Sequence, residues 1–544
     1  MNKNKKTRLL VIGLDGGTLD LLLPWAEDGR LPNFARLLRG GAHGTLLSTL
    51  PALTPPAWVS SYTGVNPGTH GIFDFFRIDS QQKLHLVNAR DVKTPFFWQF
   101  MNQQGISTGL VNAPITYPPQ PLDGFWVSGI GSPGVKSSFT YPESLRDKLV
   151  SRFDYKIRFD RLVMFYGTNR QRLRTFFDEA DRRARASEHL LKTFRPDVFF
   201  HVFDHVDVLQ HYFWKHMDET HPRHRRGPFK NAILNFLRAV DAHIGRFMEA
   251  AAPDANVVVY SDHGFGPLHY DVFTNKVLAD AGMLTAKNAP AAIRKHTRHL
   301  MRRRANKVAY QLGLRPRKKS SKPPPVDNDA PHIDWTRTRA YFPSLPGQHI
   351  RLNLAGREPN GIVSPGREAE QTIRELKRIF EGLEDPRTGQ KVVLKAYEPH
   401  EIYSGPHVPD APDLILETNP IYLFAKGFRR KTFSNSIFKD MLDRSGYHRR
   451  EGMVIISGPG VRSGARLPDS DIADIAPTLL HLAGASVPSH MQGRVIAAAF
   501  EKEPEVKLFD YDASREKGKA DSTGVYTKEE EKAVKDHLRR LGYM

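Results

Sequence analysis

The chain has 544 residues, no cysteine and a formal net charge of +20, and 40% of its residues are apolar and 25% charged. This composition is ordinary for a soluble globular protein with one large domain or up to about three smaller ones. The absence of cysteine excludes disulfides and thiolate metal sites, so any metal would have to be held by His, Asp and Glu.

The start of the chain shows no export signal. The basic residues MNKNKK are followed only by the short apolar run RLLVIGL. This run has the length of a buried strand rather than of a signal-peptide core. No run approaches the roughly 20 apolar residues of a membrane span. We therefore expect a soluble cytoplasmic protein.

Short apolar runs alternate with helical patterns along the chain. The patterns predict strands at 8–14, 45–50, 107–113, 197–203, 256–260 and 452–457, a turn at 53–56, and helices at 31–38, 58–63 and 471–484. Apolar runs this short, separated by helices, are typical of parallel strands that are covered on both faces. The predicted fold class is therefore α/β, with a sheet between two helix layers.

Two segments fit this alternation poorly. Residues 131–190 end in a charged helical stretch and are a candidate cap, and residues 286–334 form a basic insertion rich in Pro, Lys and Ser near its end. We expect one large domain over 1–500 that carries both segments. A charged tail with a short helix would follow at 501–544.

Acidic and histidine side chains follow three of the predicted strands. Asp15 comes directly after the first strand, Asp262-His263 follow 256–260, and Asp207 and His211 lie one helical turn apart after 197–203. Open α/β sheets place their chemistry at the carboxyl ends of strands, and residues i and i+4 share one face of a helix. Each feature also has a structural explanation, as a helix cap, a surface turn or an interior hydrogen bond.

The remaining candidates depend on these. Asp204 and His205 lie close to the helical pair, so the sequence leaves the choice of ligands there open. His448 is a lone histidine before the strand 452–457.

Thr54 precedes two prolines and is either a turn residue or a nucleophile. A hydroxyl is a weak nucleophile unless a base or a metal activates it. Since no G-x-S-x-G elbow accompanies Thr54, a metal would have to do so.

Taken together, these motifs resemble a known family. LDGGT, LTPPAWVSSYTGVNPGTHGIFDF, the D-x3-H pair, SDHGFG and the late histidine are similar to the alkaline phosphatase superfamily. Within it they most resemble the type I phosphodiesterase/nucleotide pyrophosphatase family, over Arg8 to about Phe500. The resemblance implies an alkaline-phosphatase-like three-layer sandwich with a mostly parallel central sheet.

The resemblance also implies a centre with two divalent cations. The first ion would be held by one carboxylate and two histidines, and the second by two carboxylates and one histidine. The ligands of the first would be Asp207, His211 and His448, and those of the second Asp15, Asp262 and His263. Thr54 would bind the second ion, attack phosphorus and pass through a phospho-threonine intermediate. Two ions about 4 Å apart can stabilise both the attacking and the leaving oxygen. Zinc is favoured, with manganese or iron as alternatives.

With threonine at the position of the nucleophile, the chain resembles the phosphodiesterase branch. Alkaline phosphatases proper use Ser, and sulfatases have an Arg four residues after the nucleophile, where this chain has Trp58. Nucleotide pyrophosphatases have a phosphate-contacting Asn shortly after the HGI motif, and that position here is about Phe75. The candidate substitutes for this contact are Asn112, Arg77 and Lys93.

The resemblance favours a metal-dependent phosphodiesterase. The alternative on the same site is a phosphomonoesterase or phosphotransferase. The alternative of another class is a noncatalytic basic protein that binds membrane or nucleic acid.

The basic insertion bears on this last alternative. Residues 286–325 contain 13 Lys and Arg and no Asp or Glu. Within 293–312 apolar residues recur at helical spacing with basic residues between them. Such a helix can lie on an anionic membrane, bind nucleic acid nonspecifically, steer anionic substrates or remain a solvated surface helix. The partners expected are a phosphoester substrate and an anionic membrane reached through 293–319, with no specific nucleic-acid binding.

Overall fold

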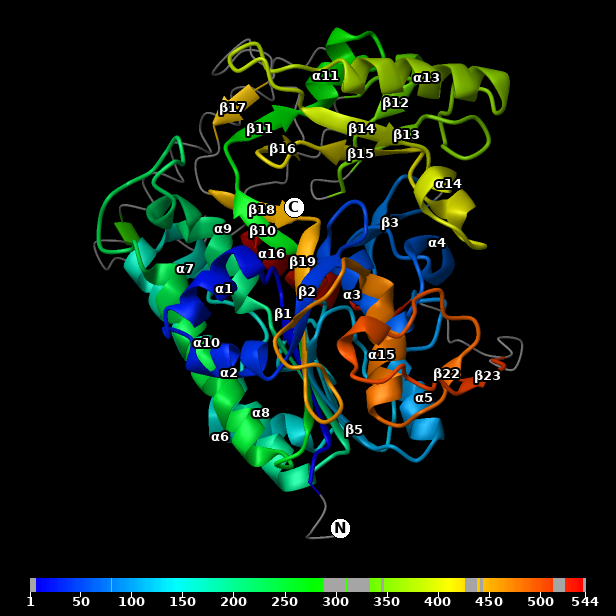
Figure 1. Cartoon of the computed structure of the whole chain (residues 1–544). Helices are drawn as coiled ribbons and strands as arrows, with labels where there is room; N and C mark the ends of the chain where they lie inside the picture. Colours follow the sequence, from blue (N-terminus) through cyan, green and yellow to red (C-terminus); the bar gives the residue numbers. More distant parts are fainter. Residues whose placement is uncertain are drawn as a thin grey trace.

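The computed structural model describes residues 6–79, 81–287, 309–310, 333–343, 347–425, 438–440, 444–511 and 524–541 (Figure 1). Within these ranges no helix is long and apolar enough to cross a membrane. The basic segment predicted to contact membranes, 293–319, lies outside the described residues except for 309–310.

A ten-stranded sheet forms the centre of the molecule, in the order β20-β2-β19-β9-β1-β8-β5-β6-β7, with β21 paired to β2. The strands are β1 (Leu9–Leu14), β2 (Gly41–Leu47), β5 (Thr108–Ala113), β6 (Gly124–Ser128), β7 (Thr140–Tyr141), β8 (Val198–Phe203), β9 (Asn256–Tyr260), β19 (Glu451–Ser457), β20 (Ala465–Arg466) and β21 (Ser470–Asp471). The five strands from β9 to β6 run parallel, whereas β19 is antiparallel to both of its neighbours. The predicted α/β class is confirmed.

Helices cover both faces of this sheet. Figure 1 shows one layer with α1 (Leu19–Glu27), α2 (Pro32–Arg39), α8 (Asn169–Phe194), α9 (His205–Met217) and α10 (Ala232–Ala250), and a second with α3 (Thr54–Thr63), α5 (Phe97–Gln103) and α15 (Ile475–Leu482). Every residue of β1, β5 and β8 is buried. This explains why these strands are continuous apolar runs rather than alternating ones.

Three elements differ from the sequence prediction by more than one residue. The strand predicted at 45–50 is β2 and ends at Leu47, and the helix predicted at 471–484 begins at Ile475, after the 3-10 turn Ile472–Asp474. The helix predicted to begin at Trp58 begins at Thr54, so the turn predicted at 53–56 is helical from Thr54 onward. Prolines at the second and third helical positions are compatible with this start, because the first turn of a helix needs no backbone N–H donors.

A second, smaller unit lies above the carboxyl ends of the parallel strands (Figure 1). It has its own buried cluster, which includes Leu376, Phe380 and Phe424. Its elements are β11 (Tyr270–Phe273), α11 (Thr274–Asp280), β12 (Ala340–Tyr341), β13 (His349–Leu352), α13 (Arg367–Glu381), β14 (Val393–Tyr397), β15 (Leu414–Thr418), β16 (Tyr422–Ala425) and β17 (Phe438–Asp440). This unit includes more of the chain than the basic insertion predicted from the sequence. Its strands are too short to give a clear hydrophobic periodicity, so the sequence did not reveal them.

The segment 131–190 and the C-terminal tail also have defined places. The candidate cap contributes α6 (Leu145–Phe153), α7 (Arg161–Tyr166) and most of α8. Because α8 contacts β5, β8 and α10, it belongs to a helix layer of the sheet. The tail forms α16 (Lys528–Leu541), which contacts α7 and buries Val534 and Leu538 in the main core.

Candidate metal centre

The acidic residues follow the carboxyl ends of three neighbouring strands in the middle of the sheet. β1 pairs in parallel with β9 on one side and with β8 on the other. Their carboxyl ends therefore adjoin, and they lead into Asp15, Asp262 and α9, whose first turn carries Asp207. All three carboxylates are buried, with at most 3% exposure. Their convergence follows from the strand order, which the sequence does not show.

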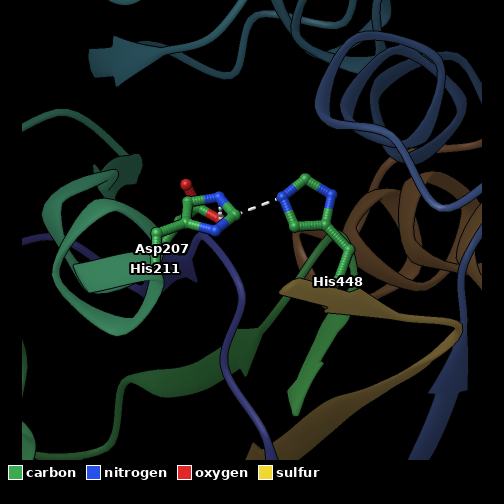
Figure 2. A group of neighbouring side chains, drawn as sticks. All are labelled: Asp207, His211 and His448. Carbon is green, nitrogen blue, oxygen red and sulfur yellow. Dashed lines mark ion pairs between the residues drawn. The ribbon is translucent and has the colours of Figure 1, made fainter. Parts of the chain in front are cut away.

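The first group of candidate ligands is Asp207, His211 and His448, whose ligand atoms all lie within 4.8 Å of one another (Figure 2). Nε2 of His211 is 3.3 Å from Oδ1 of Asp207, and Nε2 of His448 is 3.1 Å from the same oxygen. His448 lies on β18 (Gly446–Arg449), which pairs with β10 (Gly264–Pro267) so that His448 faces Phe265. This pairing places His448 beside the chain that follows His263.

The second group is Asp15, Asp207 and His263, again with ligand atoms within 4.8 Å. Nε2 of His263 is 3.5 Å from Asp15 and 3.3 Å from Oδ2 of Asp262. Oδ1 of Asp262 accepts from the N–H of Gly16 at 3.3 Å. The two groups are contiguous, because Asp207 belongs to both.

Backbone carbonyls orient all three histidines in the same way. Nδ1 of His211 lies 2.7 Å from the Gly446 oxygen, and Nδ1 of His448 lies 2.9 Å from the Ala52 oxygen. Nδ1 of His263 lies 3.0 Å from the Gly264 oxygen. A carbonyl can only accept, so each Nδ1 carries a proton, and each ring turns its Nε2 toward the carboxylates.

This arrangement brings acceptors face to face. Burial lowers the pKa of His211 and of His263, so both rings are neutral at pH 7. At 3.1–3.5 Å an Nε2 lone pair and an ionised carboxylate repel one another unless a metal ion or a proton lies between them. Among the described residues, Oδ1 of Asp15, Oδ2 of Asp262 and Nε2 of His263 have no hydrogen-bond partner. The donor set of His nitrogen and carboxylate oxygen fits a divalent transition metal such as zinc.

The carboxylates show the same need for positive charge. Burial, the charge of Asp262 and the charge of Asp207 raise the pKa of Asp15 well above its usual value. Burial and the charge of Asp207 likewise raise the pKa of Asp262. Burial opposes ionisation of Asp207 as well, but His211 and His448 outweigh it and hold the pKa well below its usual value. The side chains of the protein alone do not neutralise the negative charge of all three carboxylates.

Thr54 is the first residue of α3 and is fully buried. Its Oγ1 has no hydrogen-bond partner among the residues described. Trp58, one turn further along α3, packs against Gly13 of β1, and its side chain approaches Asp15 closely enough to lower the pKa of that carboxyl slightly. These contacts fix the helix beside the acidic edge, with a hydroxyl at its positive end.

The three substrate contacts predicted from the sequence have different surroundings. Asn112 is not available to a substrate: it is 3% exposed, and its Nδ2 donates to the Val202 oxygen at 2.8 Å while its Oδ1 accepts from Arg183 at 3.2 Å. Arg77 lies on β3 (Phe76–Ile78) and pairs with Asp91 at 3.3 Å. Lys93 is exposed beside Gly71.

One histidine that the sequence pattern did not single out lies close to α3. His70, in the GTHGI motif, is fully buried, and its Nδ1 accepts from the N–H of Ile72 at 3.1 Å. The proton is therefore on Nε2, which donates to Oγ of Ser60 on α3 at 2.9 Å. Burial lowers the pKa of His70 to about 3.

We expect His70 to make folding sensitive to acid. A folded-state pKa of about 3, below the unfolded value near 6.5, gives stability that is complete above pH 6.5 and is lost as the pH falls. At pH 5 the loss is about 2 kcal/mol relative to pH 7. In urea unfolding of the chelator-treated protein, His70→Gln should reduce the difference between pH 7 and pH 5 by this amount. The exposed control His400→Gln should leave it unchanged, and an unchanged difference in His70→Gln would contradict the assignment.

The comparisons with known proteins agree with this geometry. A family model described as Type I phosphodiesterase / nucleotide pyrophosphatase matches residues 9–448. The matched stretch begins with β1 and ends at His448, so it spans both groups of candidate ligands. A search of curated proteins gives no match. The chain therefore belongs to the type I phosphodiesterase/nucleotide pyrophosphatase family, hydrolases of phosphoester bonds in the alkaline phosphatase superfamily.

Proposed function

We propose that this protein is a phosphodiesterase that works with two divalent cations, most suitably zinc, and through a phospho-threonine intermediate. The observation that carries this proposal is the set of three histidines whose Nδ1 is bound to a backbone carbonyl and whose Nε2 lies 3.1–3.5 Å from buried carboxylates. Asp207, His211 and His448 would hold one ion. Asp15, Asp262 and His263 would hold the other, with Asp207 close to both.

The reaction divides between these residues and Thr54. When bound, the cations would stabilise charge on the attacking and leaving oxygens. Oγ1 of Thr54, which makes no hydrogen bond to any described residue, would attack phosphorus, and its proton would pass to the leaving ester oxygen. One ester oxygen would leave as the alcohol, and the phosphoryl group, with the second ester still attached, would remain on Thr54. Water would then cleave the phosphorus–Oγ1 bond and restore the hydroxyl.

A comparison of diester and monoester substrates tests this function. We expect the zinc-loaded protein to hydrolyse bis-p-nitrophenyl phosphate with a kcat/KM at least about tenfold above that for p-nitrophenyl phosphate, a difference in transition-state stabilisation of about 1.4 kcal/mol. Excess chelator should abolish both activities, and zinc should restore them. A preference for the monoester would establish the alternative, a phosphomonoesterase on the same site. Arg77 and Lys93 remain proposed substrate contacts, to be tested by the KM of Arg77→Gln and Lys93→Gln.

The basic segment 293–319 has a separate expected role at an anionic membrane. We expect the protein to sediment with vesicles that contain phosphatidylserine and not with neutral vesicles, at physiological salt. Since each Lys or Arg near the headgroups contributes about 1 kcal/mol, replacing Arg302, Arg303 and Arg304 by Gln should weaken binding on the order of 100-fold. Absence of sedimentation with anionic vesicles would remove the membrane from the function.

A further inference from the structure

Arg183 lies in α8 behind the carboxyl ends of β5 and β8 and is 2% exposed. Its Nη1 lies 2.8 Å from both carboxylate oxygens of Asp204. Its Nε and Nη2 donate to the carbonyl oxygens of Lys156 and Ile157, each at 2.9 Å. Every nitrogen of the guanidinium thus has a protein partner, so the side chain acts within the fold rather than on a substrate.

The same guanidinium connects the ends of two strands. Nη1 of Arg183 also donates to Oδ1 of Asn112 at 3.2 Å, near the end of β5. Nδ2 of Asn112 donates to the Val202 oxygen in β8 at 2.8 Å. Asn112 holds a left-handed backbone conformation with φ of 63°, which Asn tolerates better than most residues. The network therefore fixes the turn from β8 into α9.

Asp204 occupies the N-cap position of α9, yet its side chain makes no capping hydrogen bond. Asp is among the residues that cap helices best, so another interaction outweighs the cap here. The carboxylate faces Arg183 at 2.8 Å and Nδ1 of His205 at 2.8 Å. The start of α9 is consequently set by the ion pair of Asp204 with the buried Arg183. Asp207 lies in the first turn after it, and His211 follows one turn later.

We propose that Arg183 is a positioning residue for the metal centre. It holds Asp204 and Asn112, and through them it sets where α9 begins and where Asp207 and His211 point. This inference rests on the proposed function, because it assumes that these two residues are metal ligands. Partners that orient ligands from behind typically change metal affinity 10- to 100-fold when they are removed. The planar fork of Arg suits this task, because one side chain reaches a carboxylate and two carbonyls together.

The test measures zinc affinity by competition with a chromophoric chelator, alongside urea unfolding. The main variant is Arg183→Met with Asp204→Asn, which removes both charges of the ion pair together. We expect its zinc affinity to fall 10- to 100-fold. Arg183→Lys keeps the charge but cannot make all the hydrogen bonds of the guanidinium group, and we expect a several-fold loss of zinc affinity. This single variant keeps the test valid if the double variant does not fold.

The matched control is Leu190→Ala, which removes core packing from the same helix two turns beyond Arg183. It should lower stability but keep the zinc affinity of the wild type, which separates positioning from general destabilisation. Wild-type affinity in the Arg183 variants would overturn this inference alone. A wild-type protein that binds no zinc, manganese or iron would overturn the proposed function as well.

Discussion

Replacement of Thr54 by alanine is expected to lower kcat for bis-p-nitrophenyl phosphate by roughly 10⁴-fold, as for loss of a covalent nucleophile. The reason is that Oγ1 of Thr54 is a buried hydroxyl at the start of α3 that makes no hydrogen bond to any described residue. Because nothing in the described fold depends on this hydroxyl, the free energy of unfolding should change by no more than about 1 kcal/mol. Steady-state kinetics and urea unfolding of the same preparation measure both effects.

Two further measurements make this result specific to the nucleophile. Thr54→Ser keeps the hydroxyl and should retain a substantial part of the activity. In the wild type, a quenched reaction with radiolabelled substrate should trap phosphate on Thr54, and none should be trapped in Thr54→Ala. Activity of Thr54→Ala within tenfold of the wild type would rule out a phospho-threonine route.

The second large effect concerns Asp262, for which function and stability should change in opposite directions. Asp262→Asn should abolish binding of one cation and lower kcat/KM by roughly 10³-fold or more. The same substitution should stabilise the metal-free protein by roughly 1–3 kcal/mol. Burial and the charge of Asp207 raise the pKa of Asp262, so its ionisation opposes folding when no cation is bound. The amide keeps an oxygen in the place that accepts from the Gly16 N–H.

The pH dependence gives the sign of this effect. A folded-state pKa above the unfolded value means that the folded state binds more protons, so stability falls as the pH rises from about 4 through the raised pKa. The stabilisation by Asp262→Asn should therefore be small at pH 4 and should grow as the pH rises, as measured by urea unfolding with excess chelator. Asp254→Asn, an exposed carboxylate just before β9, should show no such change. Equal metal content in Asp262→Asn and the wild type would exclude this ligand.

These predictions concern residues that adjoin only because of strand order. From the sequence, Asp15 and Asp262 were recognisable because each comes at or just after the end of an apolar run, a purely local pattern. That the two runs are β1 and β9, side by side in the sheet with β8 on the other side of β1, is a long-range fact. Hydrophobic periodicity identifies strands but carries no information on which strands pair.

Other features were open to the sequence only in part. It did not separate Asp204 from Asp207, since both lie near the end of β8. The structure separates them, because Asp204 pairs with the buried Arg183 whereas Asp207 faces His211 and His448. Arg183 itself lies in a charged helical stretch whose sequence is typical of a solvent-exposed helix. Its burial follows from the packing of α8 on the sheet.

The amino-acid sequence by itself determined the α/β class, the principal buried strands and the family, because apolar runs and motif residues are local properties of the chain. The tertiary structure alone decided that Asn112 belongs to the interior, that Thr54 begins a helix, and that a second unit lies above the strand ends. It also decided that β18 pairs with β10 and so carries His448 to the acidic edge. The physical reason is that pairing, burial and charge compensation depend on neighbours distant in sequence.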